Sequence, residues 1–221
     1  MDKKILNKQA QHWENTFSKK IEMFGVSPSD AAIKALKSFK EEGLNKILEI
    51  GAGQGRDTFY FAKNGLKVQV LDYSQTAIDN IKKKIKILGY SKLITAKKYD
   101  VRKPLEFSNE NFDGSYSHML YCMAFTTNEL FSLNSEIFRV LKRGGLNIYT
   151  VRNTTDGDYK NGIYRGEDLY ESDGFVVHFF SEDKIRKLSE GFDILSIESF
   201  EEGAFPRKLF KVILKKKLFI R

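Results

Sequence analysis

From Lys46 onward, the chain alternates between short apolar runs rich in Ile, Val, Leu and Tyr and longer stretches whose apolar residues recur with a helical period. Strands that alternate with helices are typical of a parallel sheet covered by helices, so the pattern predicts an α/β fold. The predicted strands are residues 46–50, 67–71, 93–99, 112–118 and 146–152. The predicted helices between them are residues 56–63, 75–88 and 127–141.

The C-terminal part of the chain predicts a different pairing of strands. Residues 192–200 and 208–216 are two further apolar runs, and the segment between them suits an antiparallel hairpin. A short helix is predicted just before them, at residues 181–189.

Two other segments stand outside the alternation. Residues 153–178 begin with a polar, Gly-rich and Tyr-rich stretch that has no sustained period and is too long for an ordinary connection, so we expect a substrate loop or lid there. Residues 1–43 contain two predicted helices, 9–24 and 29–42, and we expect them to form an N-terminal cover. No linker or repeat divides the 221 residues, which predicts a single domain over residues 1–221.

Composition narrows the class of protein without selecting a function. The net charge of +8 permits nucleic acid, an anionic membrane or an acidic small molecule as a partner. Cys122 is the only cysteine, which excludes an intrachain disulfide and a zinc site built from several cysteines. No stretch approaches the roughly 18 apolar residues of a membrane span, and no apolar run follows the first lysines. We therefore expect a cytoplasmic protein without a membrane partner.

Chemistry is indicated where the first two strands end. Gly51, Gly53 and Gly55 follow the first strand and open a helix, an arrangement that lets a ligand approach the backbone and the helix N-terminus. Asp72 ends the next strand, where a carboxylate can accept both hydroxyl hydrogens of a ribose. The G-x-G-x-G spacing differs from the dinucleotide fingerprint, whose third glycine comes three positions after the second, and this argues against NAD.

At this point the sequence resembles the class I S-adenosylmethionine-dependent methyltransferases. The segment Leu48-Glu49-Ile50-Gly51-Ala52-Gly53-Gln54-Gly55 is similar to the family's first motif. Similar stretches follow at residues 70–74, 99–101 and 136–145. The resemblance implies a Rossmann-like, seven-stranded, mostly parallel sheet with an antiparallel last strand, helices on both faces and an N-terminal helical cover. It also implies S-adenosyl-L-methionine as the cofactor and S-adenosyl-L-homocysteine as the product.

The resemblance also assigns cofactor contacts by position. Asp72 would hold the ribose hydroxyls, Asp100 would meet the adenine amino group, and the Val101 backbone N–H would face the ring. Glu49 and the segment Ser117-His118 would lie near the methionyl ammonium. Arg56 would help to hold the methionyl carboxylate, with an exposed surface arginine as the alternative. The full set of expected cofactor residues is Glu49, Gly51, Ala52, Gly53, Gln54, Gly55, Arg56, Asp72, Tyr73, Asp100, Val101, Ser117 and His118.

Methyl transfer from a sulfonium requires positioning of the acceptor and needs neither a metal nor a nucleophilic residue. A general base helps when the acceptor must lose a proton, and His118 and His178 are the candidates, each with a purely structural role as the alternative. We expect no metal site. The candidate acceptor contacts are three aromatic residues and one arginine. They are Trp13, Tyr121, Tyr164 and Arg152.

Three functions follow. The first is methylation of a small molecule, because the single insertion would form a compact lid and no recognition domain is appended. The second is methylation of RNA or another nucleic acid, which the net charge and the basic residues 215–217 and Arg221 favour. The third is a non-catalytic protein that binds S-adenosylmethionine. The identity of the acceptor, the methylated atom and the oligomeric state are not determined by the sequence.

Overall fold

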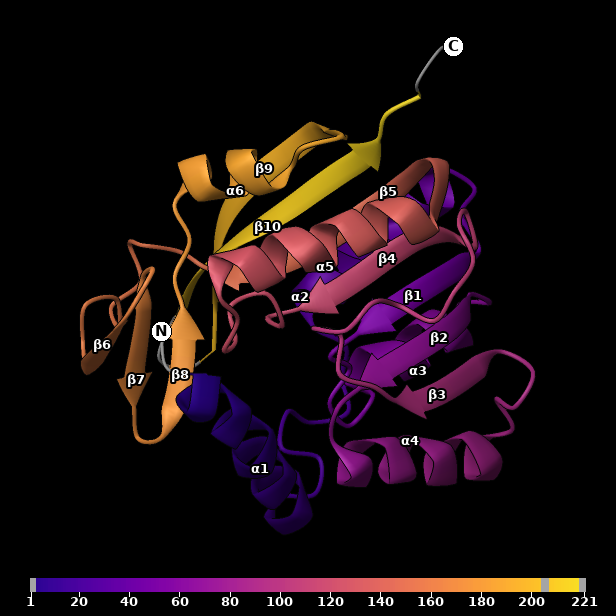
Figure 1. The fold of residues 1–221 in the computed structure, drawn as a ribbon. Helices are drawn as coiled ribbons and strands as arrows, with labels where there is room; N and C mark the ends of the chain where they lie inside the picture. The colour runs from indigo at the N-terminus through magenta and orange to yellow at the C-terminus, as the bar shows by residue number, and fades with distance from the viewer. Residues whose placement is uncertain (1–2, 204–206, 219–221) are drawn as a thin grey trace.

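The computed structural model describes residues 3–203 and 207–218, and it places a seven-stranded sheet at the centre of the chain (Figure 1). The strand order is β3-β2-β1-β4-β5-β10-β9. Strands β1 to β5 are parallel, whereas β10 is antiparallel to both β5 and β9. This confirms the predicted Rossmann-like sheet with an antiparallel last strand. The strands of this sheet are β1 (Lys46–Ile50), β2 (Lys67–Asp72), β3 (Ile94–Lys98), β4 (Phe112–His118), β5 (Leu141–Arg152), β9 (Phe192–Glu202) and β10 (Arg207–Lys216). Residues 204–206 of the predicted hairpin link and the basic Arg221 lie outside the described residues.

Helices cover both faces of the sheet. One apolar cluster joins α2, α3 and α4 to β1, β2 and β4, and a second joins α5 and α6 to the opposite face and to β10. The helix α1 lies apart, beside a second, smaller sheet (Figure 1). The helices are α1 (Lys3–Lys19), α2 (Asp30–Glu41), α3 (Arg56–Lys63), α4 (Gln75–Leu88), α5 (Thr127–Val140) and α6 (Glu182–Leu188).

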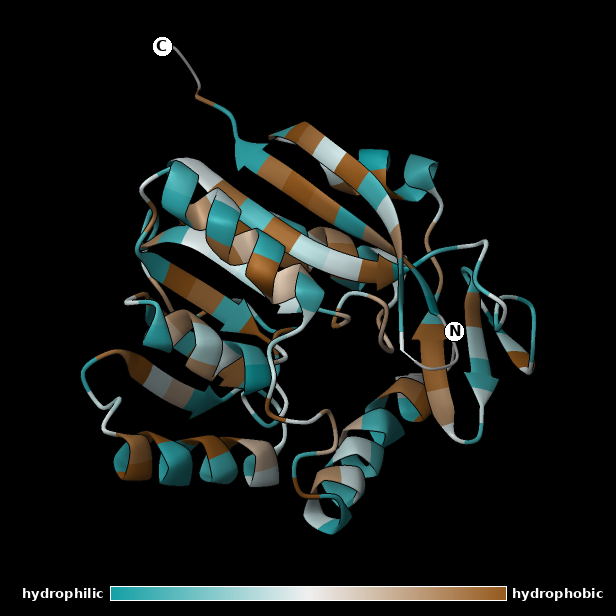
Figure 2. Cartoon of the chain, turned by 180° about the vertical axis from the view of Figure 1, so that it is seen from behind, coloured by the Kyte–Doolittle hydropathy of each residue, from teal (hydrophilic) through white to brown (hydrophobic). Residues whose placement is uncertain are grey.

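The helix α4 shows how the sequence pattern determines packing. Its cap is Ser74, whose side chain accepts a hydrogen bond from the backbone of Ala77, as predicted. Hydrophobic and hydrophilic residues alternate along the helix (Figure 2), and Ile78, Ile81 and Ile85 are buried against the sheet. Each buried isoleucine contributes about 1.5–3 kcal/mol through the hydrophobic effect.

The segment expected to form an irregular lid contains a three-stranded antiparallel sheet, hereafter the lid sheet. Its strands are β6 (Ile163–Gly166), β7 (Leu169–Ser172) and β8 (Phe175–His178). Each strand has four residues, too few for an alternating pattern to be visible in the sequence. The turns place Glu167, Asp168 and Asp173 at positive φ, where such residues carry no strong sequence signal.

Two elements differ most from the predicted ranges. Helix α1 spans Lys3–Lys19 and so begins and ends earlier than residues 9–24, and residues 21–24 form a turn. Strand β5 begins at Leu141, five residues before the predicted start, and it includes Gly144 and Gly145. A Cβ on Gly145 would lie 2.7 Å from the backbone oxygen of Asp113, so the glycine lets β5 pass close to β4 where their register is irregular.

Candidate functional site

A cavity of about 470 Å³ opens at the carboxyl ends of β1, β2 and β4. It is walled on its other sides by α1 with the turn that follows it, by the lid sheet and by the end of the β9–β10 hairpin. The strand ends and the loops after them contribute Glu49, Gly51, Ala52, Gly53, Gln54, Arg56, Asp57, Asp72, Tyr73, His118, Met119, Leu120 and Met123. The other walls contribute Trp13, Phe17, Met23, Phe24, Gly25, Arg152, Asp158, Asn161, Tyr170, Ser172, Asp173, Phe175, Val176, Val177, Phe179, Glu202 and Arg207.

The glycine turn, residues 51–55, forms the floor of this cavity. Gly51, Gly53 and Gly55 all have positive φ, which favours glycine. Packing imposes a second requirement, because a Cβ on Gly51 would lie 2.8 Å from Leu120 and a Cβ on Gly55 would lie 2.9 Å from Ile81. The turn therefore brings backbone to the cavity surface where any other residue would clash with its neighbours.

Asp72 lies at the end of β2 with its carboxylate on the cavity. One carboxylate oxygen accepts the backbone N–H of Gly53 at 2.8 Å and the other accepts that of Ser74 at 2.9 Å. Burial raises the pKa of Asp72 to about 6, although these two hydrogen bonds act to lower it. Each oxygen keeps a second lone pair, so the carboxylate can accept hydroxyl hydrogens from a ligand while it orders the glycine turn.

Glu49, in β1, is a second buried carboxyl group on the cavity. Within residues 3–203 and 207–218, its side chain has one hydrogen-bond partner, the Thr58 hydroxyl, which donates to it at 2.6 Å. Burial raises the pKa of Glu49 to about 8, and the neighbouring Asp57 and Asp72 add to this shift. A cation placed in the cavity would reverse the shift, so Glu49 is suited to a ligand ammonium group.

Helix α1 and the turn after it lie between α4 and the lid sheet, and hydrogen bonds hold them at three points. Glu14 accepts hydrogen bonds from the Ser74 hydroxyl at 2.6 Å and from the Thr76 backbone at 3.1 Å, so it caps the N-terminus of α4. Gln9 bonds the lid sheet, donating to the Gly174 backbone at 2.8 Å. Gln54 of the glycine turn accepts the backbone N–H of Met23 at 2.8 Å and donates to the Lys20 backbone at 2.9 Å. Because these bonds lie on both sides of the cavity, α1 closes it.

His118, at the end of β4, lies on the cavity with both ring nitrogens in use. Nε2 is 3.0 Å from a carboxylate oxygen of Glu202, and Nδ1 is 3.0 Å from the Thr150 hydroxyl. The ring is therefore fixed between two protein groups. Glu202, rather than His118 itself, presents a proton-accepting atom to the cavity.

Four expected cofactor contacts are not brought to the cavity. The Asp100 carboxylate is engaged by the Arg102 guanidinium at 2.7 Å, and this pairing holds the pKa of Asp100 below its usual value although burial opposes it. Val101 is buried in the apolar core. Gly55 packs against α4, and Ser117 points into the sheet interior with a buried hydroxyl that has no hydrogen-bond partner among the described residues.

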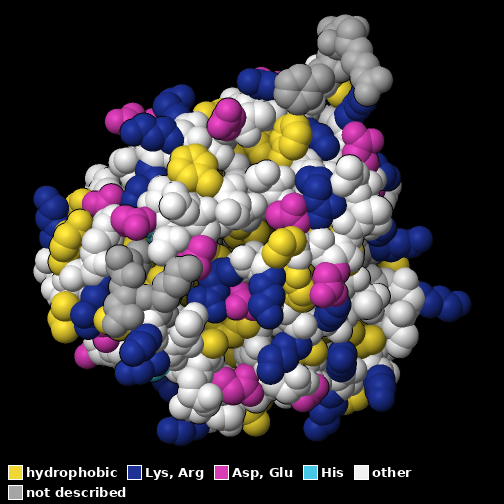
Figure 3. Space-filling model, viewed as in Figure 1, with side chains coloured by type: hydrophobic (Ala, Val, Ile, Leu, Met, Phe, Trp, Pro, Cys, Tyr) yellow, Lys and Arg dark blue, Asp and Glu magenta, His cyan; other side chains and the backbone are white. Residues whose placement is uncertain are grey.

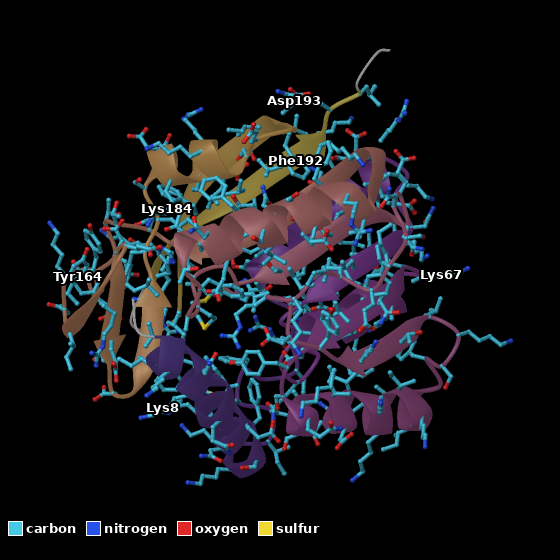
Figure 4. The ribbon with its side chains drawn as sticks, viewed as in Figure 1. Lys8, Lys67, Tyr164, Lys184, Phe192 and Asp193 are labelled. Atoms are coloured by element: carbon cyan, nitrogen blue, oxygen red, sulfur yellow. The ribbon has the colours of Figure 1, made fainter. Side chains whose placement is uncertain are left out.

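Two expected acceptor contacts are also displaced. Tyr121 is buried, stacks on Tyr149 with ring centroids 4.3 Å apart, and has its hydroxyl 3.3 Å from Asn134, so it belongs to the core beneath α5. Tyr164 lies at the outer edge of the lid sheet (Figure 4) and is 60% exposed, which removes it from the cavity.

His178 does not line the cavity either. Its Nδ1 donates to the Phe125 backbone oxygen at 3.0 Å, and its Nε2 is 2.8 Å from the Lys184 ammonium nitrogen. Burial, together with Lys184, lowers the pKa of His178 to about 4. The histidine is neutral near pH 7 and links the lid sheet to α6, which is a structural role.

Arg152 does line the cavity, but its charge is compensated. Its guanidinium pairs with the buried Asp156 and, at 2.7 Å, with Asp158, and it lies over the Phe179 ring. The sequence suggested an anion-binding arginine. Two carboxylates on one guanidinium make that role unfavourable.

Other cavity residues, which the sequence pattern does not indicate, lie on walls formed by segments that are distant in the chain. Phe17 reaches the glycine turn, where its ring would meet a Cβ on Gly53 at 3.4 Å, and Phe175 packs edge-on against Trp13. Glu202 ends β9, which runs parallel to β5 because each is antiparallel to β10. The predicted strand ends at residue 200, whereas β9 extends to Glu202 and brings it to the carboxyl edge of the sheet.

Within residues 3–203 and 207–218, no group of three or more His, Cys, Asp or Glu side chains is arranged to hold a metal ion. Across the same residues, no helix is both long enough and apolar enough to cross a membrane.

Comparison with known proteins finds a similarity to one family. Residues 47–145 match the family model described as a methyltransferase domain. Over this segment, which is less than half of the 221 residues, the chain is similar to methyltransferase domains. No curated protein matches the chain by sequence.

Solved structures share the fold of this chain at low identity. An S-adenosylmethionine-dependent methyltransferase from Methanosarcina mazei is 20% identical, with a TM-score of 0.67 over 79% of this chain and 93% of that chain. The 1,6-didemethyltoxoflavin-N1-methyltransferase of Burkholderia thailandensis is 17% identical, with a TM-score of 0.68 over 86% and 79%. Magnesium protoporphyrin IX methyltransferase from Synechocystis is 16% identical, with a TM-score of 0.64 over 84% and 81%.

The residues of the cavity fit the cofactor of this family, S-adenosylmethionine. Gly51 and Gly53 let a ligand approach the backbone of the turn, the Asp72 carboxylate has acceptor capacity for a ribose, and Glu49 lacks a cationic partner among the described residues. This fit rests on the chemistry of the groups that face the cavity. Of the expected cofactor contacts, those on the cavity are Glu49, Gly51, Ala52, Gly53, Gln54, Arg56, Asp72, Tyr73 and His118.

Proposed function

We propose that this chain transfers the methyl group of S-adenosylmethionine to a small-molecule acceptor. The observation that carries the proposal is the shape of the site: one cavity of about 470 Å³, closed by α1 and the lid sheet. This volume is within the range of about 300–1,000 Å³ typical of small-molecule sites. A polymer would have to displace α1, which is hydrogen-bonded on both sides of the cavity.

The cofactor would lie along the glycine turn. Asp72 would accept the ribose hydroxyl hydrogens, Glu49 would pair with the methionyl ammonium, and Arg56 at the start of α3 would pair with the methionyl carboxylate. When bound, S-adenosylmethionine supplies an activated methyl group on a sulfonium. The chain's own residues would then orient the acceptor and exclude water. Holding the two reactants in the correct geometry accelerates the methyl transfer.

The acceptor would occupy the space between the cofactor and the lid sheet. Aromatic and methionine side chains dominate this wall, including Trp13, Phe175 and Met123. The Burkholderia and Synechocystis neighbours are named for small-molecule acceptors, which supports the same class here. We propose that residues 1–221 act as a single domain, with residues 1–43 as cover and 153–178 as lid. The single cysteine favours a cytoplasmic location.

Methylation of nucleic acid is supported less well. Lys and Arg side chains on the face shown in Figure 3 are mixed with Asp and Glu and form no continuous basic strip there. Cys122 is buried, and burial raises the pKa of its thiol to about 11, so it is a poor nucleophile for attack on a base. The non-catalytic alternative, a protein that binds S-adenosylmethionine without turnover, is distinguished only by a transfer assay.

The test is the fate of a labelled methyl group. The purified protein is incubated with methyl-labelled S-adenosylmethionine and, separately, with the small-molecule fraction of a cell extract, with total RNA and with DNA. We expect label only in the small-molecule fraction. Label in RNA or DNA would support the nucleic-acid alternative, and binding of the cofactor without transfer to any fraction would support the non-catalytic one.

A further inference from the structure

Glu202 is a carboxylate on the cavity that lies outside the matched family segment of residues 47–145. It is the last residue of β9, and its side chain is about one quarter exposed, at 28%. Within residues 3–203 and 207–218, only one of its carboxylate oxygens, Oε2, has a hydrogen-bond partner, the Nε2 of His118 at 3.0 Å. The other oxygen is available to a ligand.

His118 holds this carboxylate in place through a defined chain of hydrogen bonds. The Thr150 hydroxyl oxygen accepts the backbone N–H of Met119 at 2.9 Å and lies 3.0 Å from Nδ1 of His118. An oxygen that already accepts one N–H can donate its own hydrogen to Nδ1, which leaves the hydrogen of the neutral ring on Nε2. Nε2–H then donates to Glu202. The ring therefore orients the carboxylate.

Glu202 is ionised near neutral pH. Burial raises its pKa, but the hydrogen bond from His118 and the nearby charges of Arg56 and Arg207 outweigh burial and hold the pKa below its usual value. A half-buried ionised carboxylate with an unused oxygen is suited to a cationic ligand group.

The balance of charged side chains around the whole cavity also favours a cationic ligand. Among the described residues that line it, six are acidic and three are basic, and the acidic groups still outnumber the basic ones when Glu49, whose pKa is about 8, is left out, in a chain whose net charge is +8. One of the three basic residues, Arg152, is already paired with two aspartates. An anionic acceptor would therefore be repelled, whereas a cation would be attracted and its apolar part would contact the aromatic wall.

We propose that the methyl acceptor is a small amine with an apolar body, and that the Glu202 carboxylate binds its ammonium group and orients its nitrogen. This inference rests on the proposed function and specifies its substrate class. A phenol or a carboxylic acid would have to react as an anion beside an excess of carboxylates. An amine enters as a cation and reacts as a neutral group.

The steps balance as follows. One proton passes from the ammonium nitrogen to water, and the lone pair remains on nitrogen. That pair forms the bond to the methyl carbon while the carbon–sulfur bond breaks and its electron pair stays on sulfur. The products are a methylated ammonium ion and S-adenosylhomocysteine, and Glu202 stays ionised throughout.

The test is calorimetric binding to the protein saturated with S-adenosylhomocysteine, with two pairs of probes of similar size. Phenethylamine and tryptamine are the amines, and phenylacetate and indoleacetate are the matched anions. We expect the amines to bind at least about tenfold more tightly than the anions, and Glu202→Gln to remove most of this preference. Glu201→Gln, an exposed neighbour on β9, is the matched control and should keep it. Glu202→Asp retains the charge and should also keep the preference.

Each other outcome is decisive. The amine proposal alone is overturned if the anions bind as tightly as the amines or more tightly, or if neither series binds. It is also overturned if a Glu202→Gln variant that still binds S-adenosylhomocysteine keeps the full preference for amines. Failure of the wild-type protein to bind S-adenosylhomocysteine in the preceding titration overturns the proposed function instead.

Discussion

Replacement of Glu49 by glutamine tests how the cavity receives a ligand ammonium group. Glutamine has nearly the same shape, and its amide oxygen can still accept the hydrogen bond that Thr58 donates to Glu49 at 2.6 Å. The substitution therefore removes the charge and leaves the local packing in place. Glu41→Gln, on the exposed side of α2, is the matched control.

The pKa of Glu49 determines the expected magnitudes. With a pKa of about 8, the carboxyl group is about nine-tenths protonated at pH 7. An ammonium group that pairs with the ionised form must displace this proton, so binding should release about 0.9 proton per ligand at pH 7. The charged hydrogen bond contributes about 1.5–3 kcal/mol, and ionising Glu49 at pH 7 costs about 1.4 kcal/mol. The variant should therefore bind roughly tenfold more weakly at most.

The same group affects stability without ligand. Unfolded Glu49 ionises near its ordinary value of 4.5, whereas folded Glu49 ionises near 8. Between these values the folded state holds more protons, so its stability is complete below about pH 4.5 and declines as the pH rises towards 8, by up to about 1.4 kcal/mol per pH unit. The Glu49→Gln variant should lack this decline.

The assay is titration with S-adenosylhomocysteine at pH 7 in buffers of different ionisation enthalpy, which reports the number of protons released. We expect release in the wild type and in Glu41→Gln, and none in Glu49→Gln. Equal proton release in all three proteins would refute the assignment of Glu49 to the ammonium group.

Three further substitutions test other parts of the account. Asp72→Asn removes the charge and one of the two acceptor oxygens, so affinity for S-adenosylhomocysteine should fall about hundredfold by calorimetry; a change under about threefold would contradict the ribose assignment. Glu14→Gln weakens the bond between α1 and the Ser74 hydroxyl, and hydrogen exchange in α1 should accelerate; unchanged protection would show that this contact does not hold the cover closed. His178→Ala leaves the Lys184 ammonium without its ring partner and should cost about 1–3 kcal/mol in denaturant unfolding, with S-adenosylhomocysteine affinity unchanged. Lost affinity with normal stability would instead place His178 in the site.

The parts of the fold that the sequence predicted are those with a strong local signal. Strand β1, α3 and α4 were predicted to the residue, because the glycine turn separates the first two and the Ser74 cap with an isoleucine stripe defines the third. The same signals located Asp72 on the cavity. Its position follows from the strand end alone, since adjacent parallel strands end at one edge of the sheet.

The parts that the sequence could not predict depend on contacts between distant segments. The lid sheet has strands of four residues, and its pairing depends on turns that carry no distinctive residues. Arg152 looked available for an anion because Asp156 and Asp158 are recognisable as its partners only once the loop is folded. Tyr121 looked like an acceptor contact because strand periodicity does not reveal that the loop after β4 turns it into the core.

The most direct test of the central claim is calorimetric titration of the purified protein with S-adenosylhomocysteine, with NADH as the control ligand. The account predicts saturable micromolar binding of S-adenosylhomocysteine and none of NADH, because the glycine turn and Asp72 form a site for a single nucleoside with an amino acid tail. A folded protein that fails to bind S-adenosylhomocysteine, or binds NADH equally well, would contradict it.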